Sequence, residues 1–127
     1  MRRFTVVVTC LVGLGGAVLG DEKKPELAKL PPPAKDAVDF QRDVQPILAK
    51  RCHECHGPMK QSSGLRLDAS EAALKGGNSG PVIVPGKSAD SRLIHLVAGL
   101  DAELKMPPKG PALSAEEIGK LRAWIDQ

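Results

Sequence analysis

The residues with the most distinctive chemistry form the segment Cys52-His53-Glu54-Cys55-His56. This spacing, Cys-x-x-Cys-His, is the attachment pattern of a c-type haem. Two thiols three positions apart in a helical turn reach the two vinyl groups on one side of a porphyrin. The next residue, His56, then lies under the iron and presents an imidazole nitrogen to it. The motif therefore predicts thioether bonds from Cys52 and Cys55 to one haem c, with His56 as the proximal axial ligand.

Two other chemistries use the same pair of cysteines. A redox-active Cys-x-x-Cys disulfide is typical of a thioredoxin-like βαβ frame, whereas the residues that flank Cys52 and Cys55 have a helical pattern. A structural zinc site usually needs four protein ligands. Besides the two cysteines only His53, His56 and His95 are available, and there is no second pair of cysteines. The motif and the composition together favour haem over both alternatives.

Residues 1–20 have the pattern of a secretory signal peptide. Met1-Arg2-Arg3 is a positively charged start, Phe4 to Leu19 is apolar, and small residues precede Asp21. The apolar stretch is shorter than the ~20 residues that a membrane-spanning helix needs. Cys10 lies inside this stretch and is interpreted as part of the signal. We therefore predict that the protein is exported to a periplasmic or equivalent extracytoplasmic compartment, with an uncleaved membrane anchor as the alternative.

Charge and composition narrow the class of function. The chain has 127 residues, enough for one domain, and its 18 Lys and Arg against 15 Asp and Glu give a net charge of +3. Loss of residues 1–20 removes Arg2 and Arg3 and no acid, which lowers the charge from +3 to +1 and argues against a nucleic-acid partner. Only Phe40 and Trp124 are aromatic after the signal. A haem would therefore supply a large apolar body around which the chain packs.

The segment between the signal and the motif divides into a linker and a helix. Residues 21–37 are predicted to be a Pro-rich linker with little packing before Val38, because the charged start and the prolines 31–33 favour an extended chain. Residues 39–51 have the apolar stripe of an amphipathic helix, with Asp39 as N-cap. Pro46 requires either a kink near Gln45 or a helix that begins there.

Two short helices are predicted after the motif. The first covers Ser70 to Lys75, with Ser70 as its cap and glycines as its stop. The second covers 89–98, with Asp90 as its cap. In the loop 57–69, which precedes both helices, Leu65 and Leu67 are expected to line one edge of the haem, and Arg66 is a candidate partner for a propionate. Because a haem-ligating His usually donates its other ring nitrogen to a carbonyl, we expect the Pro81 carbonyl to accept from His56.

Met106 is the expected sixth ligand of the iron. Its thioether is a soft, neutral donor, and a Met/His pair on haem iron raises the reduction potential. Two prolines follow directly and stiffen the loop, and a residue before proline is held extended. The alternative role for Met106 is that of a gap filler in the core. Met59 is too close to His56 to reach the opposite haem face, and His95 is expected to be a surface or half-buried helix residue rather than a ligand.

The last helix is predicted over 114–126. Ser114-Ala115-Glu116-Glu117 has the pattern of a capping box. One face carries Ile118, Leu121, Trp124 and Ile125. Phe40 and Trp124 are the large side chains of the first and last helices, so we expect these two helices to cross and touch there.

Taken together, the order of helix, Cys-x-x-Cys-His, loops, helix, Met loop and terminal helix resembles a class I cytochrome c. The segments CHECHGPMKQSSGLRLD, EAALKGGNSGPVIVPGKSADSRLI and KMPPKGPALSAEEIGKLRAWIDQ are similar to the planctomycete-type cytochrome c domain. The resemblance covers roughly residues 39–127. It implies a mainly α, class I cytochrome c-like domain over 38–127, wrapped around one haem with long Gly- and Pro-rich loops. It also implies haem c on Cys52 and Cys55, axial ligands His56 and Met106, and a bacterial, exported protein.

The expected function is electron transfer rather than enzymatic catalysis. A six-coordinate iron would exchange electrons with a redox partner protein, and Lys105 and Lys109 beside Met106 would help an acidic partner to dock. The alternative is a haem-containing module of a larger enzyme or sensor in which the sixth iron site is open. Domains of this type usually stand at the front of much larger proteins, whereas this sequence ends at Gln127. A free-standing small cytochrome and a fragment of a longer protein are both compatible with the pattern.

Overall fold

The computed structural model describes residues 26–127, and these fold as a set of short helices joined by long loops. The elements are, in chain order, η1 (Leu27–Lys29), η2 (Phe40–Val44), α1 (Gln45–Arg51), α2 (His53–His56), η3 (Ser62–Gly64), α3 (Ser70–Lys75), η4 (Ser88–Asp90), α4 (Arg92–Val97) and α5 (Ala115–Asp126). Over this range no strand forms, and the β-type pairings are isolated bridges at His56–Gln61 and Gly77–Gly80. The predicted helical fold class is confirmed. The signal peptide predicted over 1–20 lies outside the described residues.

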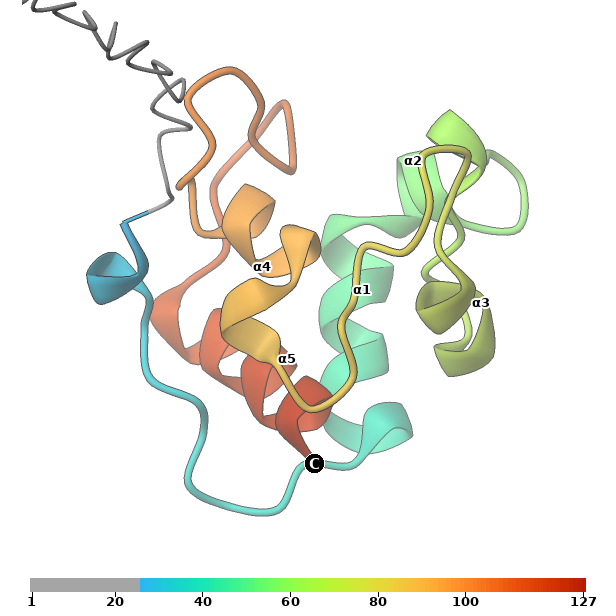
Figure 1. Ribbon diagram of the computed structural model, residues 1–127. Coiled ribbons are helices and arrows are strands. Elements are labelled where there is room, and N and C mark those ends of the chain that lie inside the picture. Colours follow the sequence, from blue (N-terminus) through green and yellow to red (C-terminus); the bar gives the residue numbers. More distant parts are fainter. Residues whose placement is uncertain (1–25) are drawn as a thin grey trace, which may run out of the picture.

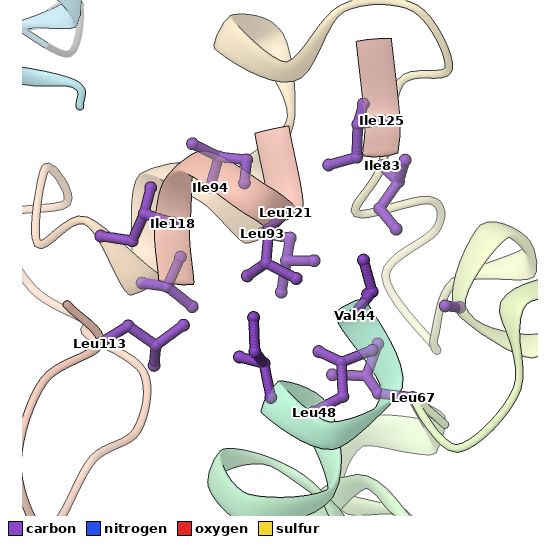
Figure 2. Close-up of a cluster of buried hydrophobic side chains, with 13 residues drawn as sticks. Val44, Leu48, Leu67, Ile83, Leu93, Ile94, Leu113, Ile118, Leu121 and Ile125 are labelled. Atoms are coloured by element: carbon purple, nitrogen blue, oxygen red, sulfur yellow. The ribbon is translucent and has the colours of Figure 1, made fainter. Parts of the chain in front are cut away.

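Figure 1 shows α1 between α4 and α5 on one side and α2 with α3 on the other. The hydrophobic core lies among the three helices α1, α4 and α5. Figure 2 shows the branched aliphatic side chains of this core pointing toward one another. Those that are fully or almost fully buried include Val44, Leu48, Leu67, Ile83, Ile94 and Leu121. Because this core consists of aliphatic chains from several elements, it fixes the helices that carry the motif.

The predicted helix over 39–51 forms in two parts. Asp39 is its N-cap, and the Asp39 carboxylate accepts a hydrogen bond from the Arg42 backbone N–H at 2.8 Å. The turn over Phe40–Val44 is a π-helix, and the α-helix begins at Gln45 with Pro46 in its first turn. Proline is tolerated there because a first-turn N–H has no partner within the helix. The expected change at Gln45 is confirmed.

Two predicted caps are wrong. Ser70 is already inside α3, whose N-cap is Ala69, and Asp90 ends η4 rather than capping α4, whose N-cap is Ser91. The Ser91 hydroxyl instead accepts a hydrogen bond from Val84 N–H at 2.9 Å and donates one to the Lys87 carbonyl at 3.0 Å. The loop before α4 therefore uses the hydroxyl that would otherwise cap the helix.

The last helix begins as predicted. The Ser114 hydroxyl accepts from Glu117 N–H at 3.1 Å, and the Glu117 carboxylate accepts from Ser114 N–H at 2.8 Å. This capping box satisfies two backbone donors at the start of α5. The expected contact between the first and last helices is also present, because the Phe40 and Trp124 rings lie with centroids 5.1 Å apart.

The expectation of little packing before Val38 is wrong. Residues 30–34 form a strap that lies against α5: Ala34 N–H donates to the Gly119 carbonyl at 2.9 Å, and the Arg122 side chain donates to the Pro31 carbonyl. Gly119 is required at this contact, since a Cβ there would lie 2.9 Å from the Pro32 carbonyl oxygen. Proline-rich composition predicts an extended chain correctly, but it does not reveal the surface on which that chain packs.

Candidate functional site

The Cys-x-x-Cys-His motif forms one helical turn at the end of α1. Cys52 N–H donates to the Leu48 carbonyl at 2.8 Å, and the Cys52 carbonyl then accepts from His56 N–H at 2.8 Å and from Cys55 N–H at 3.1 Å. Gly57 follows α2 immediately as its C-cap. A Cβ at Gly57 would lie 2.4 Å from the His53 carbonyl oxygen, so glycine is required where the chain leaves this turn.

His56 is buried, and a backbone carbonyl orients its ring. Nδ1 lies 3.3 Å from the Leu65 carbonyl oxygen. A carbonyl can only accept, so this contact places the proton on Nδ1 and leaves Nε2 as the ligand nitrogen. The acceptor expected from the sequence was Pro81, and that expectation is wrong. The chain after the motif folds back so that Leu65, rather than Pro81, faces the ring.

A second histidine holds the same returning segment. His53 Nε2 lies 3.0 Å from the Leu67 carbonyl oxygen. The Leu67 N–H donates to the His56 carbonyl at 2.8 Å. The segment 65–67 is therefore attached to the motif helix at three points. Sequence reasoning missed the role of His53, because the only available signal was its place inside the motif.

The two cysteines are free thiols, and both are half-buried. Burial raises the pKa of the Cys52 thiol to about 11. A redox-active thiol needs the opposite shift, since the thiolate is the nucleophile, so the environment of Cys52 disfavours the disulfide alternative. Within residues 26–127, no three His, Cys, Asp or Glu side chains converge in a way that could hold a metal ion. The ligand set for a structural zinc ion is therefore missing from the described part of the chain.

A cavity of about 230 Å³ opens beside the motif, with Cys52 and His56 in its wall. Cys55 is on the same helical turn but is not part of that wall. Most of the remaining wall is apolar and comes from the returning segment, from the stretch before α4 and from α4 itself. Its aliphatic members are Leu65, Leu67, Val82, Leu93, Leu96, Val97 and, from the loop before Met106, Leu104. The two leucines expected at the edge of a haem are among them.

Met106 lies in the wall of the same cavity. It is half-buried against the core, and its N–H donates to the Leu96 carbonyl at 3.1 Å, which attaches the Met loop to α4. Met59, in contrast, is 96% exposed. His95 Nε2 lies 2.6 Å from the Ala89 carbonyl oxygen, and His95 is not part of the cavity wall. Of the candidate axial ligands, the structure thus brings His56 and Met106 to one cavity.

Charged residues near the cavity pair with one another. The Arg66 guanidinium, which the sequence made a candidate partner for a propionate, donates to the Asp68 carboxylate at 2.6 and 3.0 Å. Arg92 lines the cavity and donates to Asp101 at 3.2 Å. Lys105 and Lys109 are exposed on either side of Met106.

The donor set and the wall fit a haem c. Two thiols and an imidazole stand on one helical turn, a thioether stands in the wall of the same cavity, and most of the wall between them is aliphatic. An apolar wall suits the porphyrin body, while the imidazole and the thioether are the ligand types of a low-spin haem iron. Cys52 and Cys55 would hold the group covalently, and His56 and Met106 would bind its metal.

The comparison with known families agrees with this chemistry. Residues 52–110 match the family described as Planctomycete cytochrome C. Among solved structures, a chain of Kuenenia stuttgartiensis hydrazine synthase is 27% identical with a TM-score of 0.41; the match covers 70% of this chain and 16% of that one. The present chain thus spans about a sixth of the length of that structure. No curated protein matches the chain.

Proposed function

Residues 52–110 match the family described as Planctomycete cytochrome C, and from this similarity we propose that the protein carries electrons through one covalently attached haem c with His56 and Met106 as axial ligands. The observation that supports this proposal most directly is the placement of Cys52, His56 and Met106 in the wall of one cavity. When bound, the haem supplies an iron that alternates between two oxidation states and so takes up and releases one electron.

Each side chain has a distinct task in this proposal. The Cys52 and Cys55 thiols would hold the haem covalently: each S–H would add across one vinyl double bond, with the sulfur bonding one carbon and the hydrogen moving to the other. His56 presents Nε2, because the Leu65 carbonyl holds Nδ1. Met106 would supply a neutral sulfur ligand to the iron, which would favour its reduced form and exclude small ligands. The aliphatic wall excludes water, which lowers the reorganisation that accompanies electron transfer.

The first experiment compares Met106→Ala with Met59→Ala in protein matured with attached haem. Met59 is the matched control, because it is 96% exposed and is not part of the cavity wall. We expect Met106→Ala to abolish the Fe–S charge-transfer band and to give a high-spin, open iron, whereas Met59→Ala keeps the wild-type spectrum. The measurement is absorption of the oxidised and reduced proteins.

Other outcomes of that experiment identify the alternatives. A wild-type protein that is already high-spin would exclude Met106 as a ligand and support the enzyme or sensor module with an open iron site. Protein that acquires no haem in a cytochrome c maturation system would contradict the cofactor assignment itself. The zinc site and the redox-active thiols would then be the remaining alternatives.

Export and a protein partner complete the proposal. Cytochrome c domains of this kind are extracytoplasmic, and the N-terminal pattern of residues 1–20 supports export. None of the helices between residues 26 and 127 has the length and apolar character needed to cross a membrane. The redox partner would meet the edge at Met106, where the exposed Lys105 and Lys109 favour an acidic surface.

A further inference from the structure

The loop between α4 and Met106 contains a tight turn that is built on one carboxylate. The Asp101 Oδ1 atom accepts hydrogen bonds from the backbone N–H groups of Glu103 at 2.9 Å and of Leu104 at 2.8 Å. These two bonds fix the chain direction just before Met106. They also lower the pKa of the Asp101 carboxyl, with a smaller contribution from Arg92, which is consistent with an ionised group at neutral pH.

The other oxygen of the same carboxylate attaches the turn to α4. Asp101 Oδ2 accepts from the Arg92 guanidinium at 3.2 Å. Further along the loop, Met106 N–H donates to the Leu96 carbonyl at 3.1 Å. Arg92 and Leu96 are four residues apart and therefore share one face of α4, and both line the cavity. The loop that follows α4, drawn orange in Figure 1, is thus held to the cavity side of that helix at two points.

We infer that Asp101 is a positioning residue for Met106, held in place by Arg92. The inference rests on the proposed function, since it concerns how the sixth ligand is kept at the iron. The Fe–S bond to a thioether is weak, and each loop residue that is free to move adds conformational entropy to the detached state. A turn that is fixed by three hydrogen bonds to one carboxylate lowers that entropy, so the fraction of molecules with Met106 detached falls.

Imidazole, used as a competing ligand, tests the inference in the ferric haem-loaded protein. It binds the iron only when Met106 has left, so its apparent affinity is proportional to the detached fraction. Loss of the carboxylate in Asp101→Ala removes three hydrogen bonds, and we expect imidazole to bind roughly tenfold more tightly. The imidazole affinity of Asp101→Asn should lie between those of Asp101→Ala and wild type. The amide oxygen of Asn still accepts from the two backbone N–H groups, while its NH2 group cannot accept from Arg92.

Glu103→Gln is the matched control. It removes one negative charge from the same turn, but the contact of Glu103 with Asp101 is made by its backbone N–H, which the substitution leaves intact. We expect its imidazole affinity to equal that of wild type. A Glu103→Gln effect as large as that of Asp101→Asn would attribute the change to charge alone and overturn the inference.

Thermal unfolding of the same variants separates positioning from general stability. If Asp101→Ala lowers Tm but binds imidazole like wild type, while Met106→Ala binds it more tightly, then Asp101 stabilises the fold without positioning the ligand and the inference fails. If Met106→Ala itself binds imidazole like wild type, the ligand assignment fails, and the inference fails with it. Should Asp101→Ala not yield folded protein, Asp101→Asn against Glu103→Gln carries the same test.

Discussion

At the scale of single residues, the two cysteines of the motif occupy different environments. Cys52 stands in the cavity wall and has a raised pKa, whereas Cys55 lies on the same turn outside that wall. A thiol that is hard to ionise in the cofactor-free protein is protected from disulfide chemistry until its vinyl partner arrives. Burial thus keeps the Cys52 sulfur available, and each of the two cysteines is expected to form its own thioether bond.

The cysteine variants test this expectation. In Cys52→Ser and in Cys55→Ser we expect one thioether to remain, so that haem resists extraction by acidified organic solvent. One vinyl group stays conjugated with the ring in each variant and shifts the reduced absorption band to longer wavelength. In the double variant all haem should be extracted. Haem that stays attached in the absence of both thiols would contradict covalent attachment through Cys52 and Cys55.

The motif itself was predictable, because Cys52, Cys55 and His56 lie within five residues of sequence and their chemistry depends on that local spacing. Met106 was predicted from its prolines and its ligand type, and the structure places it in the wall of the same cavity. The carbonyl that orients His56 was not predictable, because the choice between Leu65 and Pro81 depends on how a loop folds back. Such a choice is made by tertiary packing.

At the scale of elements, the start of α5 is connected to the end of α1. Arg51, the residue before Cys52, donates to the Glu117 carboxylate at 3.2 and 3.3 Å, and Glu117 also closes the capping box with Ser114. Both side chains of the ion pair are largely buried. The Glu117 carboxylate therefore stabilises the first turn of α5 and also fixes Arg51, the residue directly before the motif.

This arrangement predicts a pH-dependent stability. Burial acts to raise the pKa of Glu117, but the hydrogen bonds from Ser114 and Arg51 outweigh it, so that the pKa is lowered from its ordinary value of 4.5. The unfolded chain then binds the proton more readily than the folded protein does. The stabilisation from Glu117 is complete at a pH above its ordinary pKa, and it is lost as the pH falls through the lowered pKa of the folded protein.

Glu117→Gln should therefore lower the free energy of unfolding by about 1 kcal/mol at neutral pH, and the deficit should shrink in acid. Urea unfolding at a series of pH values measures the loss of stability at neutral pH and its decrease in acid. Glu116→Gln is the control, because that side chain is 79% exposed and should cost little at any pH. A deficit for Glu117→Gln that is the same at pH 3 and pH 7 would contradict this account.

Element boundaries were predictable where the signal was local. Asp39, the Ser114 capping box and the change at Gln45 all depend on residues within one turn, and all are present. The caps at Ser70 and Asp90 were wrong by one residue. The strap at 30–34 was missed because its partners on α5, Gly119 and Arg122, are distant in sequence.

At the scale of the whole molecule, the described residues contain an aliphatic core among the helices and, beside it, a cavity that suits a haem. The aliphatic core lies among α1, α4 and α5. Each of the loops 57–69 and 100–113 contributes one buried side chain to it, Leu67 and Leu113, and most of their other residues are exposed or half-buried. Haem should therefore order the loops more than the helices, because the loops have few buried side chains of their own and a bound haem would add a packing surface for them.

Hydrogen exchange of the protein with and without attached haem checks this division. We expect backbone amides in 57–69 and 100–113 to gain protection in the haem-loaded form, while amides of α5 that exchange through opening of the helical core change less. Equal protection of the two loops in both forms would show that they are ordered by the polypeptide alone.

The contact between Phe40 and Trp124 gives this protein a built-in optical probe. Trp124 is the only tryptophan and the chain has no tyrosine, so near-ultraviolet emission comes from a single position in α5. Its ring lies 5.1 Å from that of Phe40, at the junction where the first helix meets the last. Closure of the two ends of the domain can therefore be timed by fluorescence in the unlabelled protein, before any pigment is attached.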